Sequence, residues 1–103
     1  ENSCMSIKES RYPEDWFEKA RKDLERVGRR LKEKDIEDAA IHLQQALEKY
    51  LKGYLLSKDW KLKPTHDLEY LLDEAVKTNP DLEQFRDLCL EVTPYYTQQG
   101  HKL

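Results

Sequence analysis

Several features that would assign a function directly are missing from this chain. No apolar run approaches the ~20 residues that a helix needs to cross a bilayer, and the three glycines are scattered rather than gathered in a phosphate-binding loop. The two cysteines, Cys4 and Cys89, lie far apart in sequence. We therefore expect two reduced thiols in a cytoplasmic protein rather than a disulfide-stabilised secreted one.

Metal and catalytic motifs are also missing. His42, His66 and His101 form no H-x-x-x-H motif, no C-x-x-C occurs, and no helix carries a Glu-x-x-His pair. Asp38 and His42 do stand four residues apart, but one such pair is typical of an ordinary hydrogen bond. Cys89 lies among apolar neighbours, as expected for core packing. The sequence therefore predicts no metal, no cofactor and no self-contained catalytic site.

Charge is unevenly distributed. The net charge is −3, which argues against a general nucleic-acid binder. Residues 1–34 are nonetheless slightly basic, and most of the excess lies in the segment Lys19–Lys34. Two interpretations remain open for this segment. Its charges form a solvated helix face with i,i+4 ion pairs, or they form a basic patch for RNA or an acidic partner.

What the chain does have is helical periodicity. Pro13 and the acidic residues after it begin a first helix, Asp35 caps a second that runs to about Ser57, and Asn79-Pro80 begins the last. A third helix covers 68–76 after a loop at 58–64, with Thr65 as its cap, and Pro94 should bend or end the last helix within a turn. The spacing predicts an all-α, up-down-up-down four-helix bundle at residues 13–97, between an N-terminal arm (1–12) and a tail (98–103).

The first helix should pack through an apolar seam, whose members are Phe17, Ala20, Leu24, Val27 and Leu31, with Trp16 beside them. Gly28 lies next to this seam, where it either permits close helix approach or only weakens the helix.

The second helix has an unusually wide apolar face, typical of the central helix of a bundle. Polar residues interrupt that face, and packing alone does not require them; they are Gln45, Glu48, Lys49 and Lys52. The motif T-H-D-L follows, with His66 and Asp67 beside the free N–H groups of the third helix, where an anion can bind. The alternatives are an ordinary ion pair between Glu48 and Lys52, and a simple helix cap at T-H-D-L.

These residues together resemble the HEPN domain, a nucleotide-binding domain of higher eukaryotes and prokaryotes. The resemblance lies in A-A-I-H-L-Q-Q-A-L-E-K-Y-L-K-G-Y-L-L (Ala39–Leu56), in P-T-H-D-L-E-Y-L-L (Pro64–Leu72) and in the W-x-x-x-A-x-x-D-L pattern that begins at Trp16. It covers about residues 14–96. The resemblance implies a helical bundle, commonly a homodimer, that accompanies a nucleotidyltransferase and binds a nucleotide or substrate.

Carried over position by position, the resemblance implies a ligand pocket formed by Gln45, Glu48, Lys52, His66 and Asp67.

Many family members are metal-independent ribonuclease toxins of toxin–antitoxin pairs, with an Arg followed four to six residues later by a His, but no Arg here has a His at that spacing. The non-nuclease branch often ends with an Arg-Tyr-Pro, whereas this chain ends Y-Y-T-Q-Q-G-H-K-L (Tyr95–Leu103). We therefore expect a non-catalytic partner subunit; a ligand-free dimeric interaction module and a ribonuclease toxin are the alternatives.

Overall fold

The computed structural model describes residues 10–99, with side chains through Pro94, and all of its regular secondary structure in that range is helical. Its elements are α2 (Pro13–Lys32), α3 (Ile36–Ser57), α4 (Leu68–Thr78), a 3₁₀ helix η1 (Pro80–Phe85) and α5 (Arg86–Gln99). The predicted all-α helical bundle is confirmed. Residues 1–9 of the predicted arm and 100–103 of the tail, with Cys4 and His101, lie outside the described part. None of the helices described has the length and apolarity needed to span a membrane.

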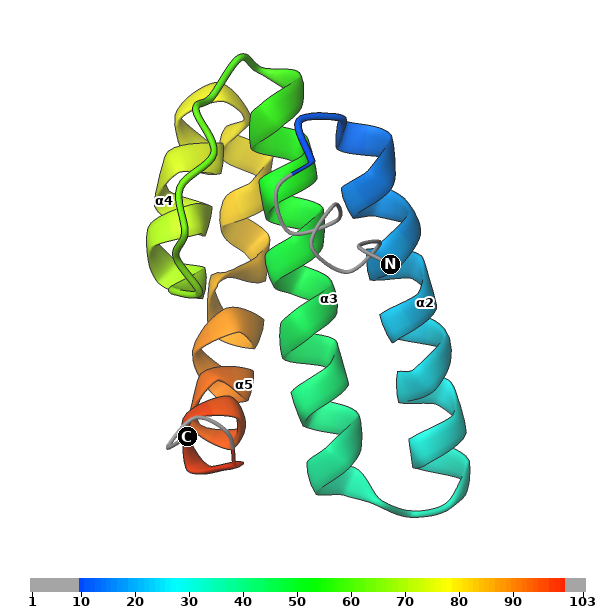
Figure 1. Ribbon diagram of the computed structural model, residues 1–103. Helices are drawn as coiled ribbons and strands as arrows, with labels where there is room; N and C mark the ends of the chain where they lie inside the picture. Colours follow the sequence, from blue (N-terminus) through cyan, green and yellow to red (C-terminus); the bar gives the residue numbers. More distant parts are fainter. Residues whose placement is uncertain (1–9, 100–103) are drawn as a thin grey trace.

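Helix α3 lies at the centre of the bundle (Figure 1). Helix α2 packs along one side of it, while α4 and α5 pack on the other, so α2 makes its extensive contacts with α3 alone. This unequal distribution leaves part of α3 between α2 and α5 without a covering helix in the described chain.

One connection departs from simple up-down alternation. The loop between α3 and α4 runs back along the bundle, so that α4 points in the same direction as α3 (Figure 1). The Tyr54 hydroxyl near the end of α3 accordingly lies 2.8 Å from the Thr78 hydroxyl at the end of α4. The return is possible because the segment before Pro64 is extended rather than helical, which is the conformation that a following proline favours.

The helix ends follow capping chemistry. Asp35 caps α3 as predicted, since its carboxylate accepts from the Asp38 amide at 3.2 Å. The cap of α4 is Asp67, which accepts from the Tyr70 amide, rather than Thr65. The Thr65 hydroxyl instead accepts from the Asp67 amide at 3.1 Å. The prediction of Thr65 was wrong because both residues suit a cap, and only the backbone path decides which one stands at the helix start.

The C-terminal ends of α2 and α3 share one unusual feature. Each is closed by paired backbone hydrogen bonds in a Schellman arrangement, and the residue in the left-handed conformation is Lys34 (φ 62°) in one case and Asp59 (φ 65°) in the other. Glycine is the usual residue there because it lacks a Cβ. Both positions therefore carry backbone strain that a glycine would relieve.

The last helix begins less regularly than predicted and ends later. The Asn79 side chain accepts from the Asp81 amide, but the turns that follow form η1 before α5 starts at Arg86. Pro94 does not end the helix, which continues to Gln99. The carbonyl of Cys89 accepts a hydrogen bond from the Thr93 hydroxyl at 2.7 Å beside the proline. Back-bonding of this kind to the i−4 carbonyl often bends a helix, and it does not replace the backbone donor that Pro94 lacks.

The main core lies between α3, α4 and α5. Its buried members are Leu51, Leu55, Leu68, Leu71, Leu72, Ala75, Cys89 and Val92. The predicted α2 seam is only half correct. Trp16 and Ala20 are buried, whereas Phe17, Leu24 and Leu31 are 37%, 40% and 49% exposed.

The glycine that permits close helix approach is Gly53 rather than Gly28. A Cβ on Gly53 would lie 2.6 Å from a Phe17 ring carbon, while nothing lies within 4 Å of one on Gly28.

Candidate functional site

Three of the predicted site residues meet in one ion-pair cluster. The Lys52 ammonium donates to Glu48 Oε2 at 2.9 Å, and His66 Nδ1 lies 2.8 Å from the same oxygen. Because a carboxylate only accepts, an ionised Glu48 requires the hydrogen on Nδ1 of His66. The Glu48 and Lys52 side chains are 9% and 6% exposed, whereas His66 is 64% exposed. The cluster thus joins a buried ion pair in α3 to a solvent-facing imidazole at the start of α4.

The N-terminal segment closes one side of this cluster. The Lys52 ammonium lies 5.5 Å from the centre of the Trp16 ring, within the range of a cation–π interaction. The Trp16 indole N–H donates to the Ser10 carbonyl at 3.0 Å, and Ser10 is itself buried. At least residues 10–12 of the predicted arm are therefore part of the folded domain.

The other two predicted site residues are placed differently. Gln45 is half-buried on α3, three residues before Glu48, and the Asp67 carboxylate serves as the cap of α4. Sequence reasoning did not single out Gln44, which is 1% exposed and precedes Glu48 by one helical turn, and its Oε1 has no hydrogen-bond partner. Gln44, Glu48 and Lys52 form a buried polar row at i, i+4 and i+8, a spacing visible in the sequence but obscured by the adjacent Gln45.

A second buried charge lies between α2 and α3. Asp23 is 1% exposed and pairs with the ammonium of Lys49 at 2.5 Å and with Arg26 at 3.1 Å. His42 stands near it, 3.3 Å from Asp38 and 4.0 Å from Asp23. The contacts of Lys49 and His42 with Asp23 join α3 to α2 at this point. The signal for Asp23 was present in the sequence, since it shares a helix face with Trp16 and Ala20.

An apolar groove opens on the uncovered side of α3. It encloses about 410 Å³, and its walls come from α2, α3, α4, η1 and α5. The lining residues are Phe17, Leu24, Leu43, Ala46, Leu47, Tyr50, Leu51, Tyr54, Leu72, Leu82, Phe85 and Cys89. None of them carries a charge at neutral pH. Because successive α-helical residues turn by about 100°, Tyr50 and Glu48 point to nearly opposite sides of α3, so the groove and the ion-pair cluster lie on opposite faces.

The remaining expectations concern metals, thiols and the basic segment. Within residues 10–94, no group of three or more His, Cys, Asp or Glu side chains could hold a metal ion. Cys89 is free and buried, and burial raises the pKa of its thiol, so it is a packing residue. Of the eight cations in the segment 19–34, Arg21, Arg26 and Arg30 pair with carboxylates, which favours a solvated helix face for these three and leaves the basic patch a prediction.

Comparison with known families identifies the chain's family. The model of the HEPN domain family matches residues 13–100, which is nearly the whole chain. Comparison with curated proteins and with solved structures gave no match.

Proposed function

Because the chain belongs to the HEPN domain family, we propose that it is a non-catalytic HEPN subunit that forms a homodimer. In this proposal it serves as the nucleotide- or substrate-binding partner of a nucleotidyltransferase. The observation that carries the proposal is the division of α3 into two faces. One face opens into an uncharged apolar groove suited to a protein partner, and the other holds the Glu48, Lys52 and His66 cluster.

A second copy of the chain fits the groove because the surface is self-complementary. Exposed apolar side chains stand at its edge, with Phe17, Leu24 and Phe85 each 37–40% exposed, beside a hollow that can receive such groups. In a two-fold dimer both subunits use the same surface patch, so that patch must carry both the protruding side chains and the groove that receives them. Phe17, Leu24 and Leu31 also repeat every seven residues along α2, the spacing with which paired helices associate. Two α2–α3 hairpins would then bury each other's uncovered stripe.

A non-catalytic role is supported by the histidines. The family's nuclease members place a His four to six residues after an Arg, a spacing absent from this sequence. Of the two described histidines, His66 is engaged with Glu48, and His42 lies between Asp38 and Asp23. Metal-independent cleavage of single-stranded RNA, abolished by His66→Ala, would support the alternative of a ribonuclease toxin.

The dimer is tested by one matched pair of variants. Leu24→Asp places a charge in the groove, while Leu90→Asp places one at an equally exposed leucine that does not line it. We expect light scattering to give a dimer for the parent and for Leu90→Asp, and a monomer for Leu24→Asp. A parent that stays monomeric at about 1 mM, the concentration at which even weak association of ~4 kcal/mol is visible, would contradict the dimer.

The ligand part of the proposal places a phosphate-bearing ligand near Gln45, Lys52, His66 and Asp67. The Glu48 carboxylate now neutralises Lys52, so a phosphate must compete with it. Glu48→Gln keeps the shape but frees the Lys52 charge, and we expect it to tighten ATP binding, whereas Lys52→Ala should weaken it. Amide shifts in a titration of the full chain measure both. Equal affinity in all three proteins would remove these residues from the site.

The interaction module without a ligand is the second candidate. It is favoured by the fact that Lys52 and Glu48 satisfy each other inside the protein, as a structural ion pair does. Absence of any saturable shift with nucleotides, together with a stable dimer, would favour this candidate over the first.

A further inference from the structure

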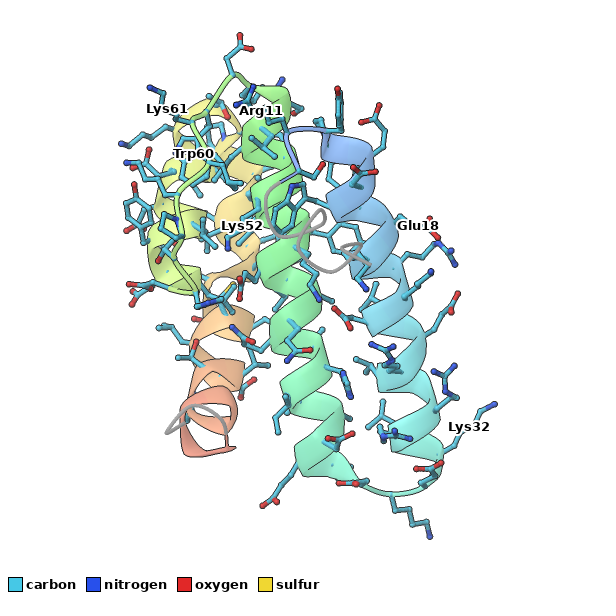
Figure 2. All side chains as sticks on the ribbon, in the orientation of Figure 1. Arg11, Glu18, Lys32, Lys52, Trp60 and Lys61 are labelled. Carbon is cyan, nitrogen blue, oxygen red and sulfur yellow. The ribbon has the colours of Figure 1, made fainter. Side chains whose placement is uncertain are left out.

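A pocket at the C-terminal end of α3 lies apart from both the groove and the ion-pair cluster. It encloses about 590 Å³, and its lining residues are Arg11, Leu56, Asp59, Trp60, Lys61 and Leu62. Figure 2 shows Arg11, Trp60 and Lys61 gathered around this end of the helix. We propose that this pocket and the extended segment beside it bind an acidic peptide segment of a partner protein, with one large apolar side chain in the pocket. The proposal deepens the partner-subunit role above and rests on it.

The floor of the pocket suits an apolar anchor. Leu56, Trp60 and Leu62 are each half-buried, so they offer apolar surface that is neither part of the closed core nor freely solvated. A side chain that enters this hollow is removed from water together with them, which is the main source of affinity in small peptide sites.

The rim supplies complementary charge. Arg11 and Lys61 are exposed and line the pocket, and neither makes a salt bridge with any of the residues that the structure describes. Arg21, Arg30 and Arg86, in contrast, are held by neighbouring carboxylates. Cations without a local partner are available to the carboxylates of another chain, and they steer its approach.

The backbone beside the pocket is free to pair with an extended strand. Residues 60–67 are not helical, and the amides of Lys61, Leu62 and Lys63 donate no hydrogen bond within the described chain. An extended peptide that pairs with such a segment gains main-chain hydrogen bonds, and a neighbouring pocket that binds one of its side chains provides specificity. This combination of free amides and an adjacent pocket is the strongest argument for a peptide.

A nucleotide fits the same pocket less well. The Lys63 ammonium already lies 5.9 Å from the centre of the Trp60 ring, so one face of the indole has a neighbour and stacking of a base there is restricted. Asp59 also lines the pocket, and its carboxylate repels a doubly charged phosphate group more than the singly charged carboxylate of one aspartate side chain. Leu56 and Leu62 offer aliphatic rather than stacking contacts.

The test is an amide-shift titration of the isotope-labelled full chain with a capped six-residue peptide that has one phenylalanine flanked by aspartates. We expect saturable shifts at Trp60–Lys63. A peptide with asparagines in place of the aspartates should bind ~5-fold more weakly, which is about the upper value for an exposed ion pair. A peptide with alanine in place of the phenylalanine should bind at least ~10-fold more weakly, because burial of a large apolar side chain contributes more.

Two charge reversals complete the test. Lys61→Glu should weaken binding of the acidic peptide by ~10-fold, because it replaces an attraction by a repulsion. Lys32→Glu, at another exposed lysine at the far end of α2 (Figure 2), should leave it unchanged. No saturable shift at 2 mM peptide, equal binding of the asparagine peptide, or tighter binding of adenosine monophosphate at Trp60 would overturn the proposal. Light scattering of Lys61→Glu separates this result from a failure of the dimer, since we expect the variant to remain dimeric.

Discussion

Replacing both members of the Glu48–Lys52 pair should cost far less stability than replacing one. In Glu48→Leu, the buried Lys52 ammonium keeps only the Trp16 ring, 5.5 Å away, as a partner among the residues that the structure describes. Stranding one charge of a buried pair typically costs about 3–5 kcal/mol of the free energy of unfolding. Lys52→Met should cost less, about 1–3 kcal/mol, because His66 still holds the Glu48 carboxylate at 2.8 Å.

The double variant Glu48→Leu/Lys52→Met removes both charges and retains similar volume. Buried pairs replaced in this way are commonly neutral or stabilising, so we expect a free energy of unfolding within about 1 kcal/mol of the parent. His66 loses its carboxylate but is 64% exposed, so water replaces that contact. The coupling energy from the cycle should therefore reach roughly 3 kcal/mol or more.

Urea unfolding followed by circular dichroism, at one protein concentration, measures all four proteins. A fixed concentration matters because dimerisation adds to apparent stability. Losses that simply add in the double variant would refute the reasoning, since they would mean that each side chain acts through packing rather than through the other's charge.

The remaining predictions concern the backbone and the thiol. Gly28→Ala should raise the free energy of unfolding by about 1 kcal/mol, because alanine has the higher helix propensity at this exposed position. Gly53→Ala should lower it by about 1–2 kcal/mol, because the new methyl group displaces the Phe17 ring. Equal effects of the two substitutions in urea unfolding would contradict the close packing of α2 against α3. Lys34→Gly should stabilise by about 0.5–1 kcal/mol by relieving the left-handed strain, and a lower midpoint would refute this. Burial raises the pKa of the Cys89 thiol in the folded state. The stability that the neutral thiol contributes is therefore complete below about pH 8.5, the pKa of an unfolded thiol, and is lost as pH rises through the higher folded value. Unfolding series at pH 7 and 10 should show this loss in the parent and not in Cys89→Ala.

Much of the candidate site could be predicted because it depends on residues near one another in sequence. Glu48 and Lys52 stand at i,i+4, so any helix brings them together. The contact with His66 spans the loop between α3 and α4, and only the return of that loop along the bundle produces it. The pocket at Trp60 depends on the same loop and on Arg11, about 50 residues earlier in the sequence, and no local pattern links the two.

The apolar seam of α2 shows where periodicity stops being informative. Spacing predicts that Phe17, Leu24 and Leu31 face other apolar groups, and it does not say in which molecule those groups reside. The structure leaves these three partly exposed because α4 and α5 pack on the far side of α3. Their exposure is the reason for proposing a second copy of the chain as the partner.

The sequence by itself determined the helices, most of their caps and the family, because helix formation and capping depend on residues within a few positions of each other. The tertiary structure decided which face of each helix is covered, that α4 runs parallel to α3, and that Asp23, Lys49 and His42 meet. Those outcomes depend on contacts between segments distant in sequence and on the path of the loop between α3 and α4, which no local pattern specifies.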